Sequence, residues 1–87
     1  MTAAALEQRR AAAVTARAVA RARTRARTDA RIEDLEELHA AGVPLEDAVT
    51  RAGWTLLAAR SALTRRRHPL ARPVNRLVHQ RRAALAR

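Results

Sequence analysis

The stretch GVPLEDAVTRAGWTLLAARSALTRRR, residues 42–67, contains both glycines of this 87-residue chain and its single aromatic residue, Trp54. Glycine often follows the last turn of a helix, because it adopts a left-handed backbone conformation at little cost. Gly42 and Gly53 therefore predict a short helix between them, over about residues 44–52. Pro44 suits its start, where a missing backbone N–H removes no intrahelical hydrogen bond.

A further short helix is predicted directly after the second glycine. Thr55 is a good N-cap residue, and the helix should run over about residues 55–67 before His68-Pro69 stops it. Only Gly53, Trp54 and Thr55 connect the two helices. Two short helices with so tight a connection have the layout of a helix-turn-helix.

The segment before Gly42 predicts a leading helix over about residues 29–41. Ile32, Leu35 and Leu38 recur at helical spacing, and Thr28-Asp29 reads as its N-cap. Residues 1–28 are rich in alanine and arginine, which favour helix but leave little to bury. We expect this basic arm to be a solvated or mobile helix, or one that becomes ordered on a polyanion.

The C-terminal segment, residues 69–87, has apolar residues at helical spacing after Pro73. It predicts a short helix over residues 74–86 that covers the core, with a basic tail as the alternative. The predicted fold class is therefore all-α. It comprises a long Arg/Ala-rich N-terminal helix, a helix-turn-helix domain over residues 29–68, and a short C-terminal helix or tail.

Charge is sorted along the chain, which carries a net charge of +10. All basic residues are arginines; residues 32–50 hold six acids and no arginine, whereas residues 51–87 hold ten arginines and no acid. A basic surface of this kind is typical of proteins that bind nucleic acid, with an anionic membrane as the second partner class.

Several functional classes lack the residues they need. There is no cysteine, the three histidines are scattered, and no catalytic or phosphate-binding motif is present. No apolar run reaches the roughly 18 residues of a membrane span. We therefore expect no enzyme activity, no metal, no cofactor and no membrane insertion. The expected location is the cytoplasm, in association with the nucleoid.

Residues 44–64 resemble the helix-turn-helix DNA-binding family, especially the small proteins of this type in actinobacteria and actinophages. The resemblance rests on small or apolar residues in the first helix, the glycine at the turn and the residues that follow it: Ala48, Val49, Gly53, Trp54, Ala59 and Ala62. It implies that the helix predicted over residues 55–67 reads the major groove of double-stranded DNA.

Helical geometry separates the two sides of that predicted recognition helix. Its outward side supplies the candidates for base contact, which are Leu57, Arg60, Ser61 and Thr64, with Arg67 on the same side. Arg60 is the leading candidate for a bidentate contact to guanine. The candidates for phosphate contact are Arg51, Arg65, Arg66, Arg67 and Arg72. Further basic contacts are expected from the arm, through Arg17, Arg21 and Arg25.

Two other functions remain open at this point. The protein could bind DNA or RNA without regard to sequence, through the release of counterions. It could instead be a protein-binding adaptor that docks through the acidic face of residues 33–47. A homodimer is also an open alternative, because a single motif of this size buries little surface on DNA.

Overall fold

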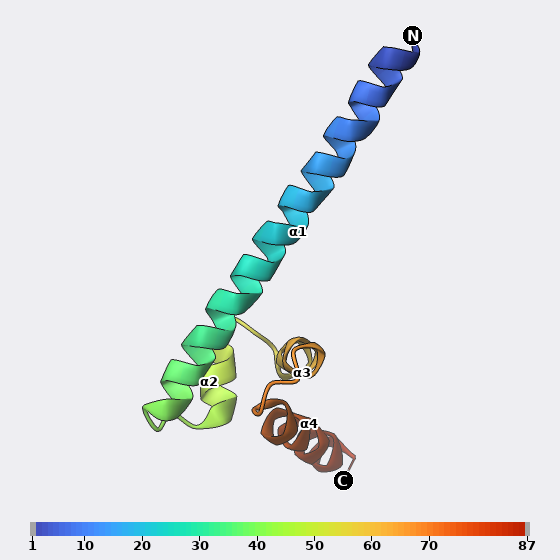
Figure 1. The fold of residues 1–87 in the computed structure, drawn as a ribbon. Coiled ribbons are helices and arrows are strands. Elements are labelled where there is room, and N and C mark those ends of the chain that lie inside the picture. Colours follow the sequence, from blue (N-terminus) through green and yellow to red (C-terminus); the bar gives the residue numbers. More distant parts are fainter. Residues whose placement is uncertain (1, 87) are drawn as a thin grey trace.

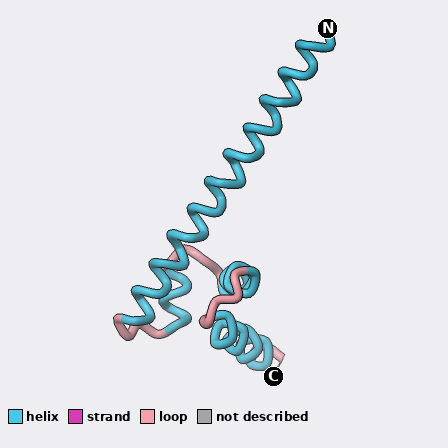
Figure 2. Tube along the Cα trace, viewed as in Figure 1, coloured by secondary structure: helices cyan, strands magenta, loops and turns pink. Residues whose placement is uncertain are grey.

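The computed structural model describes residues 2–86, which form four α-helices with no strand among them (Figures 1 and 2). In chain order the helices are α1 (Ala3–Ala40), α2 (Leu45–Arg51), α3 (Leu56–Arg65) and α4 (Ala71–Leu85). The all-α class predicted from the sequence is confirmed. Four residues separate α1 from α2, and four separate α2 from α3.

α1 is one continuous helix, so the helix start predicted at Thr28-Asp29 is wrong. The Thr28 hydroxyl donates a hydrogen bond to the Thr24 carbonyl, at 3.0 Å, and does not cap a new helix. Good helix formers surround this point on both sides, and no glycine or proline interrupts them. The basic arm and the predicted leading helix are consequently a single element.

The N-terminal two thirds of α1 project away from the other helices (Figure 1). The molecule measures 63 × 32 × 20 Å, and its length comes from this projection. Large apolar side chains on the arm are exposed, including Val14 at 60%. The arm therefore has the solvated helical form that was one of the outcomes expected from its composition.

Both glycines end a helix in the way the sequence predicts. Gly42 and Gly53 have φ values of +88° and +91°, in the left-handed region. The amide after each glycine then bonds back to the preceding helix, from Val43 to the Leu38 carbonyl at 3.1 Å after Gly42. This pattern is a Schellman motif, which satisfies helix-end carbonyls and turns the chain sharply.

α3 ends in the same motif, but with Arg67 in the glycine position. Arg67 has a φ of +53°, and the next amide, of His68, bonds to the Leu63 carbonyl at 3.0 Å. The prediction that this helix runs to Arg67 is therefore wrong, because α3 ends at Arg65. A non-glycine residue in this conformation carries a steric cost of about 1–2 kcal/mol.

The helix starts follow local capping rules. The Thr55 hydroxyl accepts a hydrogen bond from the Ala58 amide, at 3.1 Å, so the predicted N-cap of α3 is confirmed. α4 begins at Ala71, earlier than the predicted residue 74. Pro73 lies within the first turn of α4, where its missing N–H removes no hydrogen bond.

All four helices contribute to one small core. α1 supplies Ile32 and Leu35, and α4 supplies Val74 and Val78, so the C-terminal segment covers the core instead of forming a tail. α2 and α3 bury mainly small residues, which allow close packing: Ala48, Val49, Ala52, Ala59, Ala62 and Leu63. Trp54 packs against the edge of this core, and the Arg31 guanidinium lies 6.0 Å from its ring centre.

Three polar pairs link distant parts of the chain. Arg66 pairs with Asp29 and Arg81 with Glu46, while His68 Nε2 lies 2.8 Å from Glu36. The Leu70 amide donates to His68 Nδ1 at 3.0 Å. Nδ1 must therefore be the unprotonated nitrogen in the neutral ring, so Nε2 carries the proton and donates it to Glu36.

We expect Leu63→Ala to lower the free energy of unfolding by about 2–5 kcal/mol, because it removes a fully buried side chain at the centre of the core. Leu57→Ala, at a position that is 50% exposed in the same helix, should cost less than about 1 kcal/mol. Urea unfolding followed by circular dichroism gives both values. Equal losses in the two variants would contradict the assigned core.

We also expect Arg67→Gly to raise the free energy of unfolding by about 0.5–1 kcal/mol. Glycine relieves the left-handed strain, although part of that gain is offset by its greater freedom in the unfolded chain. Arg67→Ala is the matched control, since it removes the charge but keeps the Cβ atom. A gain of stability in Arg67→Ala equal to that in Arg67→Gly would show that charge, not backbone strain, is the cause.

Candidate nucleic-acid interface

The outward face of α3 brings several of the predicted contact residues together. Burial of Ala59, Ala62 and Leu63 fixes the rotation of this helix about its axis. The side chains that line one shallow hollow on its outer surface are Arg60, Ser61, Thr64 and Arg65. Three of the four predicted base-contact candidates are therefore neighbours on a single exposed face.

Arg65 occupies a different place from the one expected. It was predicted as a phosphate contact outside the set of base-contact candidates, but it lies on this outward face beside Ser61. Its Nε donates a hydrogen bond to the Ser61 carbonyl at 3.3 Å, which holds the guanidinium against the outer surface of α3. Arg60 is only partly exposed, since it lies on the side of α3 that packs against α4.

α4 forms one border of the face. Arg60 and Thr64 share a hollow with Arg72 and Asn75 at the start of α4. Arg72 thus lies where a phosphate contact was expected, next to the predicted base-reading residues. No pattern in the sequence pointed to Asn75, because only the packing of α4 against α3 brings this amide to the site.

α1 forms the opposite border. Thr24, Arg25 and Thr28 line a hollow together with Arg65 and Arg66 of the α3 end. Arg25, predicted as part of a separate arm, therefore belongs to the same surface. Arg17 and Arg21 lie farther along α1, exposed and away from α3. Arg66 is engaged with Asp29, so this predicted phosphate contact also ties the end of α3 to α1.

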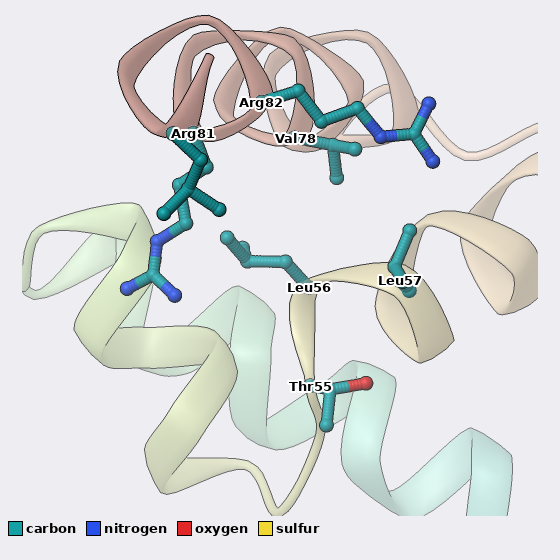
Figure 3. A pocket seen from close by; sticks show the side chains of 7 residues that line it. Thr55, Leu56, Leu57, Val78, Arg81 and Arg82 are labelled. Carbon is teal, nitrogen blue, oxygen red and sulfur yellow. The ribbon is translucent and has the colours of Figure 1, made fainter. Parts of the chain in front are cut away.

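Leu57 lies at the edge of the face, in an apolar hollow between the start of α3 and the second half of α4 (Figure 3). In this view Leu57 extends toward Arg82, whereas Leu56 points beneath Arg81 and Val78. Arg82 is a basic residue near the predicted base-contact residues, although it was not among the predicted contacts. Only the packing of α4 against α3 brings Arg82 to this position.

Two predicted phosphate contacts lie outside this cluster. Arg51 lines a hollow with Asp34 and Glu37 of α1, where the two carboxylates repel an approaching phosphate. Arg67 is exposed in the turn after α3. Within the described residues the candidate interface therefore combines the outer face of α3 with the start of α4 and one segment of α1.

Across residues 2–86, no group of three or more histidine and acidic side chains is placed to hold a metal ion. None of the described helices is both long and apolar enough to cross a membrane.

Comparison with known proteins found no matching family model, no matching curated protein and no matching solved structure. The function of this surface is therefore argued from its geometry and charge.

We expect Arg65→Gln to weaken binding to duplex DNA by about 5- to 10-fold at roughly 0.1 M salt, because the outer face of α3 then carries one positive charge fewer and binding releases about one counterion fewer. Arg51→Gln removes the same charge from the acidic hollow and should change the affinity less than about twofold. Fluorescence anisotropy with a labelled duplex measures the dissociation constants of both variants. Equal losses would mean that only net charge matters and that the outer face of α3 is not the contact surface.

Proposed function

We propose that this protein is a helix-turn-helix protein that binds double-stranded DNA, with α3 as the recognition helix. The observation that carries the proposal is the exposed face of α3, which gathers Arg60, Ser61, Thr64 and Arg65 between two basic borders. The major groove of B-DNA is about 12 Å wide and admits one α-helix. The borders then meet the phosphate strands on the two sides of the groove.

The side chains on α3 have distinct roles in this proposal. Arg60 and Arg65 carry planar guanidinium groups that donate two hydrogen bonds to the O6 and N7 atoms of guanine, a contact that contributes about 1–3 kcal/mol of discrimination. Ser61 and Thr64 donate to or accept from base edges, and Leu57 contacts a thymine methyl group. Asn75 is placed to recognise adenine at the border with α4, through its amide.

The remaining arginines position the protein without reading the sequence. Arg25 and Arg66 lie on the α1 border, and Arg72 lies on the α4 border. Arg67 extends the basic surface beyond α3. Phosphate contacts of this kind set the register and orientation of a protein on the duplex. The strained backbone of Arg67 supports a role for its charge, because glycine would fit this turn at lower cost.

Binding that ignores sequence is the second candidate, and the placement of Arg60 favours it. Arg60 is partly covered by α4, which limits how far its guanidinium reaches into a groove. Most other arginines of the chain lie outside α3, where they meet phosphates on either DNA or RNA. Under this alternative, affinity arises almost entirely from counterion release.

The biological setting completes the proposal. We place the protein in the cytoplasm, associated with the nucleoid, as a small regulator or a phage accessory factor. The exposed face of α3 is short, about 15 Å for ten residues. A second copy bound to an adjacent half-site would supply the additional contacts that tight, specific recognition requires.

Selection from a random pool of duplex DNA at physiological salt, with sequencing of the bound fraction, tests the proposal. We expect an enriched motif, and two copies of it centred about one helical turn apart if the protein binds as a dimer. Arg60→Ala should relax the preference at a guanine position and cost about 1–3 kcal/mol against the selected site.

Each alternative gives a different result in the same experiment. Retention of DNA without an enriched motif would overturn sequence-specific recognition and support binding that does not depend on sequence. A lack of binding to any duplex would overturn DNA binding. Pull-down of RNA would then identify an RNA-binding protein. Loss of function after neutralising the acidic face (Glu33, Asp34, Glu36 and Glu37) would instead identify a protein-binding adaptor.

A further inference from the structure

The packing of α1 in the core determines which way each side chain on the arm points around the helix axis. α1 runs without a break from Ala3 to Ala40, and burial of Ile32 and Leu35 fixes its rotation. At 100° per residue, Arg17, Arg21 and Arg25 fall within an arc of about 80° that also contains these two buried residues. The three arginines therefore point to the side of α1 on which the other helices pack.

The other side of the arm carries a second set of arginines. Arg9, Arg23 and Arg27 lie about 130° around the helix from the first set. All six side chains are exposed, and none forms an ion pair among the described residues. We call Arg17, Arg21 and Arg25 the near triple, and Arg9, Arg23 and Arg27 the far triple.

The near triple continues the candidate interface outward along α1. Its innermost member, Arg25, already shares a hollow with Arg65 and Arg66 of α3. Figure 1 shows α3 end-on beside the lower part of α1, and the arm extends well beyond it. The segment from Ala3 to Thr24 is about 33 Å long, close to the 34–36 Å of one turn of B-DNA.

We propose that the arm is a second DNA-binding element, and that its near triple contacts the phosphates of the duplex segment flanking the α3 site. This inference rests on the proposed function, since the position of the duplex is set by α3. A straight, positively charged helix needs no groove for this role, because phosphates are exposed along the whole outer surface of DNA. Arg17 and Arg25 are eight residues apart, about 12 Å along α1, so the flanking segment that the near triple contacts is about three to four base pairs long.

The test compares two variants of the full-length protein that carry equal charge. One replaces the near triple (Arg17→Gln, Arg21→Gln, Arg25→Gln), and the other replaces the far triple (Arg9→Gln, Arg23→Gln, Arg27→Gln). Glutamine has a helix propensity similar to that of arginine, so both variants should keep α1, which circular dichroism verifies. Binding is measured over a range of salt on two duplexes, a short one of about 12 base pairs and a long one of about 24.

The near-triple variant should lose much more affinity on the long duplex than on the short one. We expect the slope of log affinity against log salt to fall by about 2–3, and affinity at roughly 0.1 M salt to drop about 100-fold or more. The far-triple variant should change the slope by less than about 1. On the short duplex the far-triple variant should bind nearly as well as the unmodified protein. The near-triple variant should lose only the contact of Arg25 there, about 5- to 10-fold, because the arm beyond Arg25 extends past the end of this duplex.

Two results would overturn the inference, and they differ from each other. If the unmodified protein binds DNA but both variants lose the same amount, the arm acts only through its net charge, and the proposed function stands. If the unmodified protein binds neither duplex, the proposed function fails and the role of the arm fails with it.

Discussion

The burial of Ile32 and Leu35 is the constraint on which the rest of the structure depends. These two side chains attach a long, otherwise exposed helix to the core formed with α2, α3 and α4. Because α1 is unbroken, the same contact that stabilises the domain also orients the arm. The position of Arg25 beside the end of α3, and the direction of the arginines beyond it, both follow from this one packing interaction.

The small residues of α2 and α3 serve the same arrangement. Ala48, Ala52, Ala59 and Ala62 allow the helices to approach closely, so a modest core can bury α3 on one side and leave the opposite side exposed. α4 then packs against α3 and completes the core with Val74 and Val78. The resulting core is small. Truncation of one buried side chain, such as Leu63, therefore removes a large share of the free energy of unfolding.

Charge is separated in space as well as along the chain. Four of the acids of α1 lie beside Arg51, His68 or Arg66, whereas the outer face of α3 is bordered by arginines. Exposed pairs of this kind contribute at most about 1 kcal/mol each, so their main effect is on orientation. Arg67 adds to the same basic side despite a backbone conformation that favours glycine.

The sequence alone determined the all-helical class, the ends of α1 and α2, and the start of α3, because these depend on local rules: Gly42 and Gly53 at helix ends and Thr55 as a cap. It also placed Arg60, Ser61 and Thr64 on one side of α3 through helical spacing. The continuation of α1 through Thr28 also has a local cause, since a cap residue inside a run of good helix formers does not by itself begin a helix. Only the tertiary structure decided the arrival of Asn75 beside Arg60 and the placement of Arg51 among acids. Each of these depends on how α4 or α1 packs, and residues that meet only through packing leave no local pattern in the sequence.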